Sequence, residues 1–320
     1  MTAHPEAGIR ASGLTKSYVS PRGSVRAVDG LDLEVREGEF FGLLGPNGAG
    51  KSTTIAMLTT LARPDAGTAE VAGVDVLRDP VLVRQLIGVA PQRDALDRQL
   101  GVAANLEFRG RMFGMSRRAA VRRADELLER FALADRGKAG VNELSGGQLK
   151  RLVVARALVH EPRVLFLDEP TAGVDPQSRH NLWELLRELH AQGQTILLTT
   201  HHLDEAEALC GRVAVLDHGK VIACDEVAGL TALAGADTVV TITYDSGPPD
   251  RVKALEEHGA VSRAEITGTT VKVFTSSPEV VLADLVSYGY EAGARVTGAT
   301  TIRPSLESAF LMLTGREYRE

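Results

Sequence analysis

The chain has 320 residues, 44% of them hydrophobic and 24% charged, a composition that excludes a disordered or fibrous protein. The formal net charge of −6 and a pI near 5.8 argue against a general nucleic-acid binder, which usually carries a basic excess. Two cysteines are too few for a disulfide framework, and neither lies in a metal-ligand cluster. We expect no secretory signal, and no apolar run approaches the ~18 residues that a membrane span needs.

The first half of the chain predicts strands, a loop and then helices. Residues 9–35 alternate polar and apolar side chains around a turn at 21–24, which indicates an antiparallel hairpin. The apolar run 39–44 indicates a buried strand, and 54–58 indicates a helix after it. Apolar residues then recur at helical spacing within 101–162.

The second half predicts further buried strands and then a separate small domain. Apolar runs at 163–167 and 194–199 indicate strands on either side of a helix at 179–192, and 212–223 indicates another hairpin. The composition changes near 231–236. After that point the sequence predicts strands at 238–243, at 270–274 and near Arg295, and helices at 250–258, 278–288 and 305–313.

A glycine-rich loop connects the strand at 39–44 to the helix that follows it. Glycines allow backbone N–H groups to converge on phosphate oxygens, and the N-terminus of the helix adds its positive end. We expect Lys51 to reach the β- and γ-phosphates and the hydroxyl of Ser52 to bind Mg²⁺. The loop consists of Gly45, Pro46, Asn47, Gly48, Ala49, Gly50, Lys51, Ser52 and Thr53.

Two carboxylates follow the apolar run 163–167, as expected where a central parallel strand ends. We expect Asp168 to support Mg²⁺, directly or through water, and Glu169 to polarise the attacking water. Such a pair can also be an ordinary solvated strand end, but the phosphate loop earlier in the chain favours the catalytic interpretation.

A second anion-binding nest precedes a helix expected at 149–159. It consists of Ser145, Gly146, Gly147 and Gln148. Because the phosphate loop already holds one nucleotide, a second nest suggests that each chain binds the γ-phosphate across a dimer interface. By itself the motif could be an ordinary capped helix start.

Residues 144–148 match the complete LSGGQ signature, and with the phosphate loop and strand acids the chain resembles the nucleotide-binding subunit of ABC transporters. The resemblance implies an α/β P-loop NTPase fold with an antiparallel β subdomain and a helical subdomain at about 97–160. It implies an ATPase domain at 1–230 and a small α+β C-terminal domain at 231–320. It also implies ATP and Mg²⁺ as cofactors and a second copy of the chain as partner.

Four more residues match positions of that family. The resemblance implies that Tyr18 stacks on adenine, that Gln92 senses Mg²⁺ and contacts the permease, that Asp175 is the D-loop acid, and that His201 is the switch histidine. Plain packing remains open for Tyr18, a surface role for Gln92 and a helix cap for Asp175. The neighbouring His202 is interpreted as incidental.

The stretches 71–76, 84–89 and 303–316 resemble the daunorubicin-resistance type of subunit, which works with a separate ABC-2-type permease. That resemblance implies efflux of a drug-like or other hydrophobic compound, driven from the cytoplasmic face of the membrane, without a nucleic-acid partner. It implies an assembly or dimer-stabilising role for the C-terminal domain, although a simple appended domain stays open. An importer ATPase or an ABC ATPase outside transport are the alternatives. The arginine-rich stretch 109–123 could face lipid or the permease, but a solvated helix face is favoured.

Overall fold

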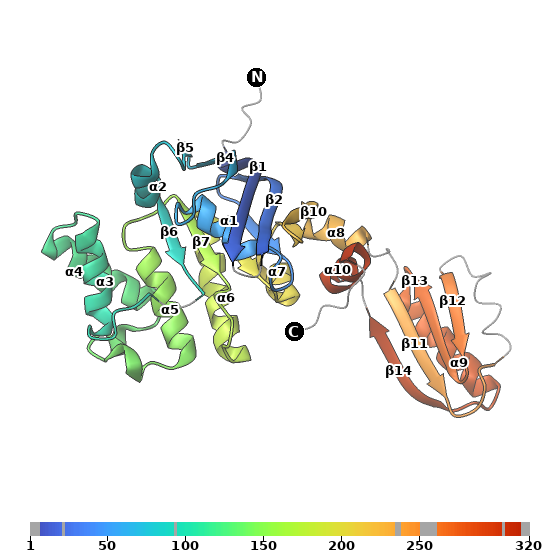
Figure 1. Ribbon diagram of the computed structural model, residues 1–320. Coiled ribbons are helices and arrows are strands. Elements are labelled where there is room, and N and C mark those ends of the chain that lie inside the picture. Colours follow the sequence, from blue (N-terminus) through green and yellow to red (C-terminus); the bar gives the residue numbers. More distant parts are fainter. Residues whose placement is uncertain are drawn as a thin grey trace, which may run out of the picture. The chain divides into compact units, whose positions relative to one another are not determined.

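The computed structural model describes residues 7–20, 23–92, 95–233, 238–249, 261–302 and 305–314. The chain divides into two compact units, Met1–Val227 and Ala228–Arg319 (Figure 1). No helix in the described ranges is both long and apolar enough to cross a membrane.

An antiparallel sheet in the first unit has the strand order β2-β1-β4-β5. The predicted hairpin forms its core, with Ile9 opposite Val35 and Tyr18 opposite Val25. The strands are β1 (Ala7–Ser20), β2 (Gly23–Arg36), β4 (Ala66–Val71) and β5 (Val74–Asp75).

The central sheet has the order β10-β9-β3-β8-β7-β6, and all its neighbours are parallel except β9 and β10. Its strands are β3 (Phe40–Leu44), β6 (Ile87–Ala90), β7 (Val164–Asp168), β8 (Thr195–Thr200), β9 (Arg212–Asp217) and β10 (Lys220–Glu226). Because β3, β7 and β8 run in the same direction, the loops that follow them meet at one edge of the sheet.

Helix α1 (Lys51–Leu58) packs against strands of both sheets. Its buried Ile55, Met57 and Leu58 join one hydrophobic cluster with side chains of both sheets, such as Val28 and Phe166. This packing fixes the start of α1, and with it the phosphate loop, against the central strands.

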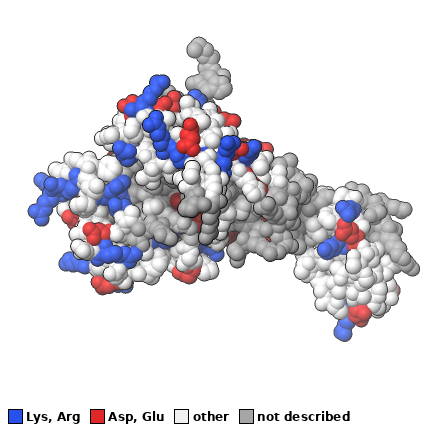
Figure 2. All heavy atoms as spheres, viewed as in Figure 1, with Lys and Arg blue, Asp and Glu red and all other residues white. Residues whose placement is uncertain are grey.

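Helices α3, α4 and α5 pack together and form the helical region. Helix α4 is amphipathic: it buries Ala120, Ala124 and Leu127 and exposes arginines on its other face. Figure 2 shows these basic side chains over α4, as expected for a solvated helix face. Helix α5 also contacts β6, and α7 contacts β3 and β8 of the central sheet. The helices are α2 (Pro80–Leu86), α3 (Val102–Met112), α4 (Arg117–Arg130), η1 (Ala134–Arg136), η2 (Val141–Glu143), α5 (Gly146–Ala157), α6 (Pro176–Ala191) and α7 (Leu203–Leu209).

Two of these helices begin three residues earlier than predicted. Helix α5 starts at Gly146 and α6 at Pro176, because the side chains of Ser145 and Asp175 cap their N-termini. Proline at the first helical position also suits α6, since its missing N–H would have no intrahelical partner.

The second unit contains an antiparallel sheet in the order β12-β13-β11-β14, and Val281 and Leu285 of α9 pack on it. The helix predicted at 250–258 lies outside the described residues. Strand β12 was not predicted, because only Val261 of its side chains is buried and the period-2 pattern is weak. The elements are α8 (Val227–Leu233), β11 (Thr238–Tyr244), β12 (Val261–Thr267), β13 (Thr270–Thr275), α9 (Pro278–Glu291), β14 (Val296–Ile302) and α10 (Leu306–Thr314).

Candidate functional site

The phosphate loop lines a cavity of about 430 Å³ at the carboxyl end of β3. The cavity brings together parts of the chain that are far apart in sequence. Its walls are formed by Tyr18, Val25, Arg26, Ala27, the loop residues 46–53, Gln92, Glu169 and His218.

Gly50 ends the loop and is the residue before α1. Its φ of 111° lies in the left-handed region, and a Cβ atom there would collide with the carbonyl oxygen of Ala27. Only glycine satisfies both conditions without strain. The turn therefore directs the first N–H groups of α1 into the cavity, where they can receive a phosphate group.

Lys51, the first residue of α1, is 5% exposed. Its Nζ donates to the carbonyl oxygens of Gly45 at 2.6 Å and Pro46 at 3.2 Å, and lies 3.8 Å from Oε1 of Glu169. Burial lowers the pKa of Lys51, whereas the carboxylates of Glu169 and Asp168 raise it. The ammonium group is thus a buried cation whose charge is balanced inside the chain.

Asp168 is the last residue of β7, and its Oδ1 atom accepts two hydroxyl hydrogen bonds. The donors are Ser52 at 3.2 Å and Thr199 at 2.6 Å. Carboxylate and hydroxyl oxygens are the hard ligands that Mg²⁺ prefers, so Ser52 and Asp168 fit a magnesium site. Thr199 was not predicted from the sequence; the signal was its place at the end of the apolar run 194–199, directly beside Asp168 across the β7–β8 pair.

Glu169 is the point on which several predicted residues converge. Its backbone has a φ of 50°, a conformation that costs energy for a non-glycine residue and recurs at functional sites. Oε2 accepts a hydrogen bond of 2.6 Å from Nε2 of Gln92, and Oε1 lies 3.1 Å from Nδ1 of His201. The carboxylate is only 7% exposed, so its position is fixed by these neighbours and by Lys51.

Two further charged residues, for which the sequence predicted no role, have defined partners in the structure. Nζ of Lys150, on α5, donates to the carbonyl oxygens of Gln92 at 3.2 Å and Glu169 at 3.5 Å. Glu205 on α7 is fully buried and accepts hydrogen bonds from Thr171 at 2.9 Å and Trp183 at 3.1 Å. Burial raises the pKa of Glu205, which favours its neutral form.

The signature residues and Asp175 do not line the described walls of this cavity. Ser145 and Gln148 form a capping box, with Gln148 N donating to Ser145 Oγ at 3.3 Å and Ser145 N to Gln148 Oε1 at 3.0 Å. Asp175 caps α6 through Ser178 N at 2.9 Å, as the helix-cap alternative anticipated. The starts of α5 and α6 are adjacent, since a Cβ atom at Gly147 would lie 2.5 Å from Ser178 Oγ.

The side chain of Tyr18 is 45% exposed and borders the cavity, whereas Phe40 and Phe41 are buried in the core. Tyr18 is therefore not part of the buried core of the unit. An exposed aromatic ring beside a phosphate site is available to stack on a base.

A second hollow, the groove, has a volume of about 330 Å³ and lies next to the Gln92 segment. Burial, and then the nearby Arg156, lower the pKa of Arg109 to about 10, and burial lowers the pKa of Arg156. Among the described residues neither arginine has an ion pair, and the Arg109 guanidinium stacks 4.5 Å from the Phe113 ring centroid. The groove is lined by Thr59, Leu61, Arg84, Ile87, Val89, Pro91, Ala95, Arg109, Phe113 and Arg156.

Residues 28–172 match the family model described as ABC transporter. The daunorubicin resistance ATP-binding protein DrrA3 of Streptomyces coeruleorubidus is 42% identical over 321 residues, which cover 98% of each chain. The Nod factor export ATP-binding protein I of Paraburkholderia xenovorans (strain LB400) is 44% identical over 318 residues, covering 99% of this chain and 100% of that one.

Solved structures match a large part of the chain. The dimeric post-hydrolysis state of the ATP-binding cassette MJ0796 bound to ADP and Pi aligns with a TM-score of 0.64 and 27% identity, covering 68% of this chain and 98% of that chain. The cavity geometry, the family match and the full-length relatives agree. The chain therefore belongs to the ABC transporter family, as one of its ATP-hydrolysing ATP-binding subunits.

Proposed function

We propose that this subunit is the motor of an exporter, in which two copies of the chain hydrolyse Mg·ATP and drive a separate ABC-2-type permease. The observation that carries the hydrolytic part is the convergence of Gln92, Lys51 and His201 on the buried carboxylate of Glu169.

In this proposal the cavity holds the nucleotide by its two ends. Tyr18 stacks on the adenine, and the loop N–H groups with Lys51 hold the phosphates. Ser52 and Asp168 hold Mg²⁺, and Gln92, whose side chain bonds Glu169, senses the ion. The ion would neutralise charge that develops on the phosphates. These roles are supported by the hydroxyl–carboxylate contact of Ser52 and Asp168 and by the burial of Lys51.

Glu169 orients the attacking water and accepts its proton, and His201 stabilises the γ-phosphate. Gln92 and Lys51 fix the two carboxylate oxygens, so little rearrangement is needed before reaction. Lys150 positions the segments that carry Gln92 and Glu169 by bonding both of their carbonyl groups.

The signature and Asp175 act on the nucleotide of a second copy. Ser145, Gly146, Gly147 and Gln148 form a helix N-terminus outside the cavity walls, which supports an anion site that is completed only in a dimer. The post-hydrolysis state of MJ0796, a dimer bound to ADP and Pi, is a precedent in a structural neighbour. The capping contact of Asp175 with Ser178 would hold the two interface motifs together.

The groove is the docking site for a cytoplasmic segment of the permease. Leu61 is 76% exposed at its rim, and most of its lining is apolar. Because Arg109 and Arg156 are partly buried without an ion pair in the described chain, the docking segment should carry an acidic side chain. Docking beside Gln92 would link nucleotide state to transport, and would hold the subunit at the cytoplasmic face of the membrane.

Export, rather than import, is supported by the names of full-length relatives, which are daunorubicin resistance and Nod factor export proteins. We propose a drug-like or other hydrophobic compound as the substrate class, with specificity set by the permease and no nucleic-acid partner. The second unit would then serve assembly with the permease or stability of the dimer.

The test is a pull-down of tagged Glu169→Gln protein from solubilised membranes with Mg·ATP. The variant should bind ATP, form a dimer and hydrolyse no ATP, and it should recover an integral membrane protein with several spans. The same variant without nucleotide is the control and should recover less. Wild-type turnover by the variant would contradict the role of Glu169. Recovery of ribosomal or DNA-repair proteins without any membrane protein would contradict the transport function but leave the ATPase intact.

A further inference from the structure

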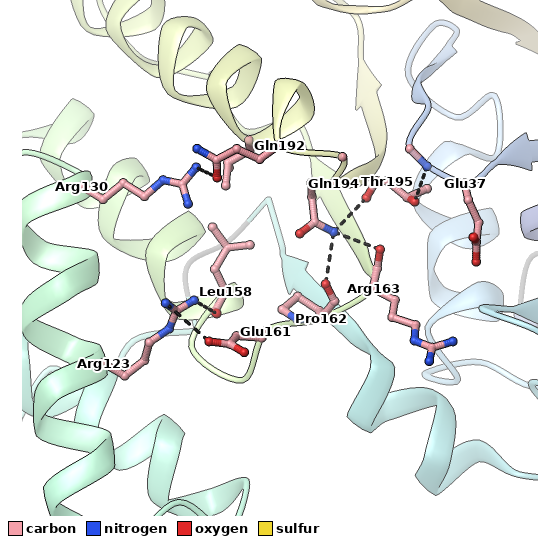
Figure 3. Close-up of a pocket in the computed structure, with 13 residues that line it drawn as sticks. Glu37, Arg123, Arg130, Leu158, Glu161, Pro162, Arg163, Gln192, Gln194 and Thr195 are labelled. Carbon is pink, nitrogen blue, oxygen red and sulfur yellow. Dashed lines mark hydrogen bonds and ion pairs between the residues drawn. The ribbon is translucent and has the colours of Figure 1, made fainter.

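A third cavity, of about 560 Å³, lies at the amino ends of the central strands (Figure 3). Its wall includes Arg163, which directly precedes β7, and Gln194 and Thr195 at the start of β8. The nucleotide cavity lies at the opposite, carboxyl ends of the same strands, so the two sites are separate. A hollow of this size accommodates a small molecule.

Two arginines of α4 extend into this cavity in Figure 3. Arg123 and Arg130 are seven residues apart, which places them on the same helix face. Nη2 of Arg130 donates to Oε1 of Gln192 at 2.7 Å, and within the described ranges Arg130 bonds this neutral amide and forms no ion pair. Burial lowers the pKa of Arg130, and Arg123 lowers it further, while Glu188 raises it.

Arg123 also has unused hydrogen-bonding capacity. Its Nε is buried and has no partner, although its other nitrogens bond Leu158 O and Glu126 at 3.2 Å each and lie 3.7 Å from Glu161. The carboxylates of Glu37 and Glu161 line the cavity too, against the guanidinium groups of Arg123, Arg130 and Arg163. Glu126 and Glu161 balance the charge of Arg123, whereas Arg130 and Arg163 form no ion pair among the described residues.

The opposite wall is held in place by Gln194. Its Nε2 donates to the carbonyl oxygens of Pro162 at 3.2 Å, Arg163 at 3.0 Å and Thr195 at 3.3 Å. The wall is thus a fixed surface facing two guanidinium groups from another part of the unit, and a ligand between them would contact both.

We propose that this cavity binds a small phosphate-bearing anion, distinct from the nucleotide substrate, between α4 and the starts of β7 and β8. A guanidinium group recognises phosphate oxygens through two parallel N–H donors, and Arg130 has donors that its single amide partner does not use. The bound anion ties the helical region, which carries the signature, to the central sheet, and so it stabilises the folded unit by mass action.

The test is calorimetric titration of the full chain with fructose 1,6-bisphosphate and with inorganic phosphate, while the nucleotide cavity is saturated with Mg²⁺ and a non-hydrolysable ATP analogue, whose γ-phosphate keeps free phosphate out of that cavity. Saturable binding is expected for the phosphate compounds. Stronger binding of the ester would identify a phosphorylated metabolite, and equal or stronger binding of inorganic phosphate would identify the free ion. Absence of binding by both phosphate compounds would overturn the proposal.

Gln192→Glu provides the decisive variant. The glutamate carboxylate takes the place of the amide whose Oε1 accepts the hydrogen bond from Arg130. The contact between residue 192 and Arg130 is therefore kept, while the positive charge of Arg130 is neutralised. Affinity should fall about tenfold or more, because a charge-assisted hydrogen bond to the ligand is lost. The control is Gln85→Glu, which adds the same charge at an exposed position of α2 and should bind as wild type. Equal affinities in the two variants would overturn the assignment to this cavity.

Discussion

Buried charges in the nucleotide cavity have partners within the chain, whereas the arginines of the groove beside Gln92 have no ion pair among the described residues. In the cavity, Lys51 lies 3.8 Å from Glu169, and Asp168 accepts two hydroxyl hydrogen bonds. In the groove, Arg109 is desolvated and faces a second arginine. Leaving a buried charge uncompensated is costly. We infer from this difference that the buried charges of the cavity are paired within the chain, whereas the buried arginines of the groove are paired by a second protein.

The largest effect is expected for Lys51→Ala, which removes the cation from the compensated site. Turnover should fall by about a hundredfold or more, because a preorganised charge that stabilises the transferring phosphate is lost. Phosphate release at saturating ATP measures this loss. Lys138→Ala, at an exposed position, is the control and should keep wild-type turnover. Substantial turnover in Lys51→Ala would show that Glu169 does not work with this lysine.

A matched pair of threonines compares the two regions directly. Thr199→Val removes a 2.6 Å hydrogen bond to Asp168 inside the core and should lower the free energy of unfolding by about 1–3 kcal/mol. Thr59→Val, at the groove, removes a bond to the carbonyl oxygen of Ile55 that is local to its own helix, and should cost about 1 kcal/mol or less. Urea unfolding of both variants measures the difference. Equal losses would contradict the idea that the cavity depends on compensation of Asp168.

The nucleotide cavity was largely predictable because its chemistry is contiguous in sequence. Residues 45–53 and the pair Asp168–Glu169 each sit directly after an apolar run, which fixes their place at the edge of a parallel sheet. Thr199 and Lys150 were missed because their contacts depend on which strands and helices are neighbours, and spacing does not reveal that order.

The groove was not predicted, because its lining comes from segments between Thr59 and Arg156 that show no common motif. The arginine-rich stretch was visible in the sequence, but only the packing separates Arg109, which is desolvated, from Arg111, which is exposed. The starts of α5 and α6 were predicted three residues too late, because the ranges followed the apolar pattern and did not take account of the local caps at Ser145 and Asp175.

The smallest effect on the isolated chain is expected for Arg109→Met, and the informative result is whether the free energy of unfolding rises or falls. Methionine keeps an unbranched side chain against the Phe113 ring but removes a desolvated charge. The free energy of unfolding should therefore stay the same or rise by up to about 1 kcal/mol, as found when buried ionic groups are replaced by apolar ones. Arg111→Met, at an exposed site on the same helix, should change the free energy of unfolding by less than about 0.5 kcal/mol.

In the membrane pull-down, Arg109→Met should recover less permease than Arg111→Met, since the acidic partner loses its counter-charge. A clear loss of stability in Arg109→Met, with full recovery of the permease, would mean that this arginine serves the fold of its own chain and that the groove needs no acidic partner.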